Sequence, residues 1–186
     1  YNQPFALSGE MDVKAAAFKD GKMLGKVSGK KLYGNLISGK SFTVTPPIGG
    51  AKGDIFGEND VLGTDISTFG LTNGKRGNIA SMTPWSGFRM NDACNKLVFI
   101  VEFEQPTTVS KVVFGSLYNP ASVILPPSVA TVETSSDGRK YDKMAEASFK
   151  RNYPERGRKA FTDTLGFAPK EVKYIKITLQ NGGTLR

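Results

Sequence analysis

The chain has no histidine among its 186 residues, and this absence removes several classes of chemistry at once. Histidine is the commonest general base and the commonest metal ligand in proteins. Ser–His–Asp and Cys–His catalysis and histidine-based zinc sites are therefore excluded. The single cysteine, Cys94, excludes an internal disulfide, and we expect it to be a small buried apolar side chain.

Long apolar runs are lacking as well. The longest of them, such as residues 97–101, are far too short to span a bilayer, so no transmembrane segment is predicted. The chain begins with Tyr1 and shows no signal peptide, as expected of a processed product or an excised fragment. Its 21 glycines and 10 prolines are scattered singly, which favours many short strands joined by turns over a flexible linker.

Acidic residues are too few to balance the basic ones, and the net charge is +8. Lysines are spread through residues 14–40, and a second basic group, mixed with acids, lies at 139–159. No recognition helix, RNA-binding strand motif or zinc-finger spacing accompanies either group, so no nucleic-acid partner is predicted. Binding to a membrane surface stays open as an alternative, and it would require exposed apolar loop tips such as Ile124 and Leu125.

Alternating hydrophobicity predicts an all-β fold. Asp20-Gly21 lies between two apolar-containing runs and predicts a hairpin over 11–33. The run at 97–103 is typical of a strand buried on both faces, and we expect it to pair with 108–117. A helix over 140–149 is the best helical alternative. Further strands are predicted at 41–45, 129–135, 160–167 and 172–179. About eight strands with regular turn signals indicate a β-sandwich or jelly roll.

Aromatic and polar residues in two loops are the main candidates for a binding site. They are Trp85, Phe88, Arg89 and Asn91 in 83–92, and Tyr118 and Asn119 in 116–128. An aromatic face stacks on the apolar face of a pyranose ring, while Arg and Asn hydrogen-bond its hydroxyls. These rings, Trp85 above all, can equally plug the ends of the sandwich. The carboxylates lie beside turns or on exposed strand faces, so no catalytic pair is predicted.

The loop 71–78 has some features of a cation site. Asn73 offers a side-chain oxygen, and two glycines allow the backbone to fold back and present carbonyls to a hard cation such as Ca²⁺. An ordinary Asn-Gly turn is the alternative, and Lys75 and Arg76 disfavour a dense anionic cage.

Several stretches in this order resemble the discoidin, or F5/8 type C, domain, a galactose-binding-like jelly roll. They are LTNG (71–74), WSGF (85–88), ND (91–92), LVFIVEFEQP (97–106), LPPSVATVETSSDGRKY (125–141) and VKYIKITLQN (172–181). The segment 12–47 is similar to the end of the small β-sandwich found beside such domains in bacterial chitobiases and β-hexosaminidases. The resemblance implies that 1–40 is part of that small sandwich or a linker hairpin, and that 41–186 is the jelly roll.

The resemblance also implies a function. It predicts a non-catalytic carbohydrate-binding module of a chitobiase-like glycoside hydrolase, secreted, periplasmic or on the cell surface. Its partners would be galactosides or N-acetylhexosamine glycans and the parent catalytic domain, and its ligand loops would be about 78–91 and 116–127. A structural Ca²⁺ would be held near Leu71, Asn73 and Arg76, with Asn73 where the family usually has Asp. The alternative is a spacer domain that packs against the catalytic domain.

Overall fold

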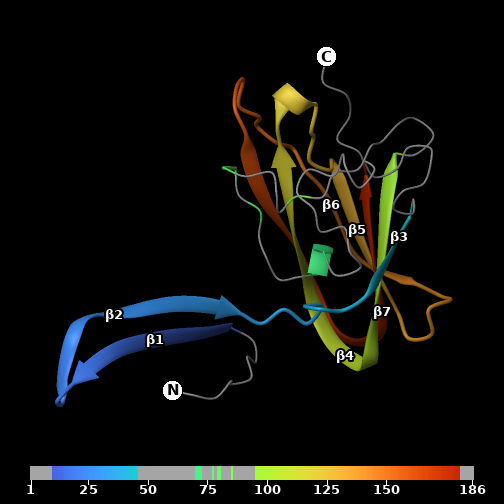
Figure 1. Ribbon diagram of the computed structural model, residues 1–186. Coiled ribbons are helices and arrows are strands. Elements are labelled where there is room, and N and C mark those ends of the chain that lie inside the picture. Colours follow the sequence, from blue (N-terminus) through green and yellow to red (C-terminus); the bar gives the residue numbers. More distant parts are fainter. Residues whose placement is uncertain are drawn as a thin grey trace. The chain divides into compact units, whose positions relative to one another are not determined.

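The computed structural model describes residues 10–45, 70–72, 77, 79–80, 85 and 95–180 (Figure 1). Their regular elements are strands and two short 3-10 turns, so the all-β prediction is confirmed. The elements are β1 (Glu10–Lys19), β2 (Lys22–Tyr33), β3 (Phe42–Thr45), η1 (Gly70–Thr72), β4 (Lys96–Tyr118), η2 (Pro120–Ser122), β5 (Val129–Ser135), β6 (Asp142–Ser148) and β7 (Lys159–Gln180). No helix of this described part is long and apolar enough to cross a membrane.

The chain divides into two units, residues 1–36 and 37–186. In the first, β1 and β2 form the predicted antiparallel hairpin. Asp20 and Gly21 both have positive φ, 50° and 77°, as the tight turn between twisted antiparallel strands requires. A two-stranded hairpin encloses no core of its own, and several of its described large apolar side chains are exposed, among them Phe18 and Leu24.

The second unit is built on one antiparallel sheet with the strand order β3-β4-β7-β5-β6. Its two longest strands, β4 and β7, pair along nearly their whole length and bend together, so the sheet folds over on itself (Figure 1). The pairing register breaks between Glu102 and Thr107 and again between Val109 and Lys111. Pro106 and Pro169 lie at these breaks, where the ladder needs no backbone N–H that proline lacks.

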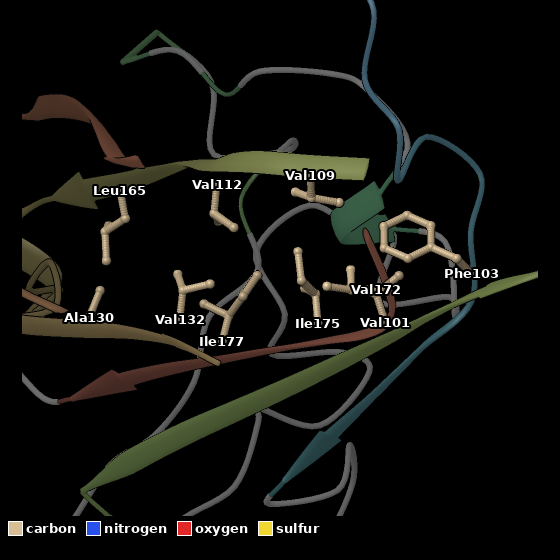
Figure 2. Packing of buried hydrophobic residues seen from close by; sticks show 10 residues of the cluster. All are labelled: Val101, Phe103, Val109, Val112, Ala130, Val132, Leu165, Val172, Ile175 and Ile177. Atoms are coloured by element: carbon tan, nitrogen blue, oxygen red, sulfur yellow. The ribbon is translucent and has the colours of Figure 1, made fainter. Parts of the chain in front are cut away.

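The fold-over produces a two-layered sandwich with the core between the layers. Figure 2 shows Val109, Val112 and Leu165 of one layer facing Val132 and Ile177 of the other. The core residues are almost entirely buried; they are Val101, Phe103, Val109, Val112, Ala130, Val132, Leu165, Val172, Ile175 and Ile177. The predicted sandwich architecture is thus present in the second unit.

Two predictions about individual elements are wrong. Residues 97–103 and 108–117 do not pair with each other, because they are the two halves of the bent strand β4, and each half pairs with β7. The helical alternative over 140–149 is also wrong, because residues Asp142–Ser148 form the edge strand β6, which pairs with β5. Its Met, Ala, Glu and Lys residues favour a helix locally, but Ala145 and Ala147 pack against the core, and that packing overrides propensity.

Candidate functional site

One end of the sandwich is formed where β4 ends and β7 begins. In the register of these strands Phe114 lies opposite Asp163, and Ser116 lies opposite Phe161. Side chains alternate along each strand, so these residues and Tyr118 share the inner face. The loop 149–158, between β6 and β7, covers this face through its contacts with Phe114, Phe161 and Asp163.

A buried ion pair anchors that loop. The Arg151 guanidinium makes a bidentate contact with Asp163, with Nη1–Oδ1 and Nη2–Oδ2 distances of 3.1 and 2.6 Å. The two side chains are only 6% and 10% exposed. The guanidinium also lies between two rings, 4.6 Å from the centroid of Phe149 and 4.5 Å from that of Phe161. This combination of fork geometry and cation–π contact fixes both the loop and the rings.

Tyr153 is the aromatic ring that this arrangement presents to solvent. It stacks on Tyr118 with a centroid distance of 4.5 Å and an interplanar angle of 20°. It also meets Phe161 edge to face, at 6.1 Å and 89°. Tyr153 is 38% exposed, whereas Tyr118 is 5% exposed and serves as its backing. Sequence reasoning missed Tyr153 because it lies in a basic stretch; a tyrosine between Lys/Arg residues and next to Pro154 was the available signal.

Asn119 has a structural role in the loop that follows β4. The residue is 3% exposed, and its Nδ2 donates to Ser122 Oγ at 3.1 Å. Backbone hydrogen bonds in both directions between Asn119 and Ile124 close the loop. At its tip Val123 adopts the left-handed conformation, with φ 53°, and is 69% exposed. A β-branched residue rarely adopts this conformation, so the loop tip carries backbone strain.

Trp85 lies on the other face of β4. Its indole covers Gly77 so closely that a Cβ there would overlap the ring, and a Cβ at Gly115 would meet it at 3.7 Å. Because Gly115 and Tyr118 point to opposite faces of the strand, the structure does not bring Trp85 and Tyr118 together. Trp85 is half-buried and packs against the outer face of β4, which fits a structural role. The predicted site residues Phe88, Arg89 and Asn91, like Cys94, lie outside the described residues.

The predicted cation loop is described only in part. Leu71 belongs to η1 and is 42% exposed, while Asn73 and Arg76 lie outside the described residues. The neighbouring Thr72 is buried; its Oγ1 donates to the Lys40 carbonyl at 2.8 Å, and its own carbonyl accepts from the Gly39 N–H at 2.9 Å. Within the described ranges no group of three or more Asp, Glu, Cys or His side chains gathers. The Ca²⁺ site stays a prediction.

A polar hollow of about 220 Å³ lies at the other end of the sandwich. It is lined by Ser135, Ser136, Asp137, Lys140, Asp142, Lys170, Glu171 and Val172. Asp137 Oδ1 accepts the backbone N–H groups of Arg139 and Lys140, and these bonds lower the pKa of Asp137. Lys170 pairs with Asp142 at 3.1 Å. The hollow thus consists largely of groups already engaged with one another, and its lining includes no aromatic ring.

Comparison with known proteins shows likeness only to solved structures. No family model matches the chain, and no curated protein matches it. One similar structure is a chitosan-binding module of a chitosanase/glucanase from Paenibacillus, with 13% identity and a TM-score of 0.47 over 82% of this chain and 91% of that one. Another is the Clostridium perfringens module CpGH89CBM32-5 in complex with GalNAc-β-1,3-galactose, with 18% identity and a TM-score of 0.32 over 47% and 56% of the two chains.

A third similar structure is the C-terminal domain of a chitobiase from Bacteroides fragilis, with 16% identity and a TM-score of 0.31. Here the match covers 48% of this chain and 55% of that one. The chain therefore spans only a little over half the length of two of these three structures.

Proposed function

We propose that the second unit is a non-catalytic carbohydrate-binding module that holds a sugar ring against Tyr153. The observation that carries the proposal is an exposed tyrosine ring lying flat on a second, buried tyrosine, at 4.5 Å and 20°. An aromatic side chain exposed in this way offers an apolar face to the C–H face of a pyranose. The exposed Asn152 next to it supplies an amide that can bond sugar hydroxyls.

Rigidity is the second element of the proposal. Tyr153 rests on Tyr118 and Phe161, and Phe161 in turn rests on the Arg151–Asp163 pair. A ring fixed before the ligand arrives loses little conformational entropy on binding. One ring still buries only a small part of a sugar, so we expect weak binding to a single unit, with dissociation constants of about 1 mM.

The proposal includes the setting that the sequence resemblance implies. The module would accompany an exported chitobiase- or hexosaminidase-like glycoside hydrolase and bring it to galactoside or N-acetylhexosamine glycans. The chain's own part would be adhesion, and no residue of it is assigned a catalytic role. A Ca²⁺ near Leu71, if the parent protein carries one, would be structural.

A glycan array with purified protein tests the proposal, followed by titration calorimetry on the best ligands. We expect binding that Tyr153→Ala abolishes. The matched control is Tyr141→Ala, which removes a partly exposed tyrosine whose ring contacts Lys176 on another part of the sandwich. Binding that survives Tyr153→Ala in a folded variant, or that Tyr141→Ala also abolishes, would contradict the proposed site. Binding to no glycan at all would contradict the function.

The hairpin supports a second candidate function, an interaction domain. Phe18, Met23, Leu24 and Val27 of β1 and β2 are between 49% and 65% exposed, and two strands alone are marginally stable in water. A neighbouring domain of the parent protein would bury these side chains. Copurification with the parent catalytic domain, compared for the wild type and a Phe18→Ser/Leu24→Ser variant, tests this role; equal recovery of both would exclude it.

A further inference from the structure

The positive charges of the second unit are distributed unevenly relative to its carboxylates. On the sheet around β5 and β6, and on the adjoining half of β7, lysines are matched with acids. The pairs are Lys143–Glu146, Lys170–Asp142, Lys173–Glu102 and Lys176–Glu133, with N–O distances from 2.8 to 3.5 Å. These neighbours cancel one another's charge and leave little net potential there.

The loop around Tyr153 differs. It carries Lys150, Arg156 and Arg158, and Lys159 follows it as the first residue of β7. All four are exposed, and no carboxylate of the described residues lies within ion-pair distance of any of them. Arg151 is the exception, because Asp163 neutralises it in the interior. Glu155 is the only acid between residues 149 and 159. The aromatic platform, formed by Tyr153, Tyr118 and Phe161, therefore adjoins a segment whose exposed cations have no carboxylate partner, and these charges produce a local positive potential.

Lys159 places one of these charges at the platform itself. Its Nζ lies 5.1 Å from the centroid of Phe161, the ring that meets Tyr153 edge to face. The same atom lies 3.5 Å from the backbone carbonyl of Asn152, the residue before Tyr153. Lys159 is also opposite Tyr118 in the β4–β7 register. An anionic group on a sugar stacked at Tyr153 would thus lie within reach of an ammonium with no carboxylate partner.

We infer that this site selects sugars that carry an anionic group, a sulfate ester or a carboxylate, over their neutral counterparts. The inference rests on the proposed function, because it assumes that a sugar ring occupies Tyr153. Lys159 provides the nearest charge, and Arg156 and Arg158 add to the potential. Sulfates and carboxylates share the chemistry that these side chains recognise, a compact anion that accepts charge-assisted hydrogen bonds.

A sugar suits these observations better than a nucleic acid or a membrane. A nucleic acid strand requires a track of cations with several stacking rings, whereas the loop presents Tyr153 as its one exposed ring. A membrane surface requires a tip of several apolar side chains that enter the lipid, whereas in the loop after β4 Val123 is exposed but Ile124 and Leu125 are half-buried, so one valine is available for such a contact. The single-ring, multiple-cation arrangement matches one charged sugar unit.

Matched pairs of ligands test the inference on the full chain. Calorimetry would compare N-acetylglucosamine with its 6-sulfate, N-acetylgalactosamine with its 6-sulfate, and galactose with galacturonic acid. We expect one or more anionic members to bind about fivefold more tightly than the neutral partner in about 0.02 M salt. In about 0.5 M salt, where the screening length is roughly 4 Å, the ratio should fall towards one. The sulfate and uronate pairs distinguish the two sources of charge.

Variants separate the charge from the platform. Lys159→Gln should lower the ratio of anionic to neutral affinity to about twofold or less, and Lys159→Arg should restore it. Lys111→Gln, on β4 seven residues before Tyr118, removes one exposed lysine of the same unit away from the loop and should leave the ratio unchanged. Neutral sugars that bind as tightly as anionic ones would overturn the inference while the proposed function stands. If phosphatidylserine vesicles or oligonucleotides bind more tightly than every sugar, the inference is overturned in favour of another anionic ligand. If the wild-type chain binds none of the sugars, the proposed function itself is refuted.

Discussion

Replacing Asp163 with alanine should destabilise the second unit by about 3–5 kcal/mol, because it leaves the Arg151 guanidinium charged in a buried site. With 6% of its side chain exposed, the Arg151 guanidinium is largely shielded from water, and its Nε already lacks a hydrogen-bond partner. The substitution removes two charge-assisted hydrogen bonds, each worth about 1.5–3 kcal/mol. The cation–π contacts of Arg151 with Phe149 and Phe161, worth about 2 kcal/mol when desolvated, are present with or without Asp163 and therefore do not offset this loss.

Urea unfolding measures this loss. Trp85, the only tryptophan of the chain, provides the fluorescence signal, and an unchanged slope with urea would show that the unfolding reaction is the same. The double variant Arg151→Met/Asp163→Leu removes both charges and should return the stability to within about 2 kcal/mol of the wild type. A cost below about 1 kcal/mol for Asp163→Ala, or a double variant less stable than the single one, would refute the reasoning.

Three further substitutions test other parts of the unit. Gly77→Ala introduces a Cβ that overlaps the Trp85 ring, so the fluorescence maximum should move to longer wavelength and the stability fall by about 1–3 kcal/mol; an unchanged spectrum would contradict this contact. Val123→Asn should raise the stability by about 0.5–1 kcal/mol in urea unfolding, because Asn tolerates the left-handed conformation better; a loss would show that Val123 makes a compensating contact. Hydrogen bonds lower the folded-state pKa of Asp137, so its stabilisation is present above the unfolded value of about 3.9 and is lost as the pH falls through the folded value. The difference in urea midpoint between the wild type and Asp137→Ala should therefore be constant from about pH 5 to 8 and shrink below about pH 4; a difference that stays constant as the pH falls below about 4 would contradict the assigned bonds.

Much of the fold could be predicted from local sequence. Asp20-Gly21 marked the hairpin turn, and the alternation of 129–135 marked β5, because turn chemistry and strand periodicity act over a few residues. The continuity of β4 could not be predicted in the same way. Its bend at Gln105-Pro106 resembles a turn between two strands, and only the pairing of both halves with β7 distinguishes a bent strand from a hairpin.

Of the candidate site, the backing residue Tyr118 was among the residues predicted from the sequence, whereas Tyr153 and its loop, residues 149–158, were not. Asn119 lies in the loop after β4, as expected, whereas Tyr118, predicted in the same loop, is the last residue of the strand. The burial of both depends on Tyr153 and Ser122 and on the register of β7. Nothing in the spacing of Arg151 and Asp163, twelve residues apart across a loop, indicates that they meet. Trp85 covers Gly115, and Gly115 and Tyr118 point to opposite faces of β4 because they are three residues apart on the strand. The sequence could have indicated this only if β4 had been known to extend through both residues.

The same contacts connect the stability of the unit with its proposed binding. Tyr153 is held by Tyr118 and Phe161, and Phe161 is held by the buried guanidinium of Arg151. The Arg151→Met/Asp163→Leu variant should therefore remain folded and yet present a less rigid Tyr153, with a severalfold weaker affinity for neutral and anionic sugars alike. Lys159→Gln would change the preference between those sugars without this common loss. On this reasoning the Arg151–Asp163 pair can be replaced without a large loss of stability, but it is required to hold Tyr153 rigid for binding. That requirement would explain why a buried ion pair lies beneath the exposed ring.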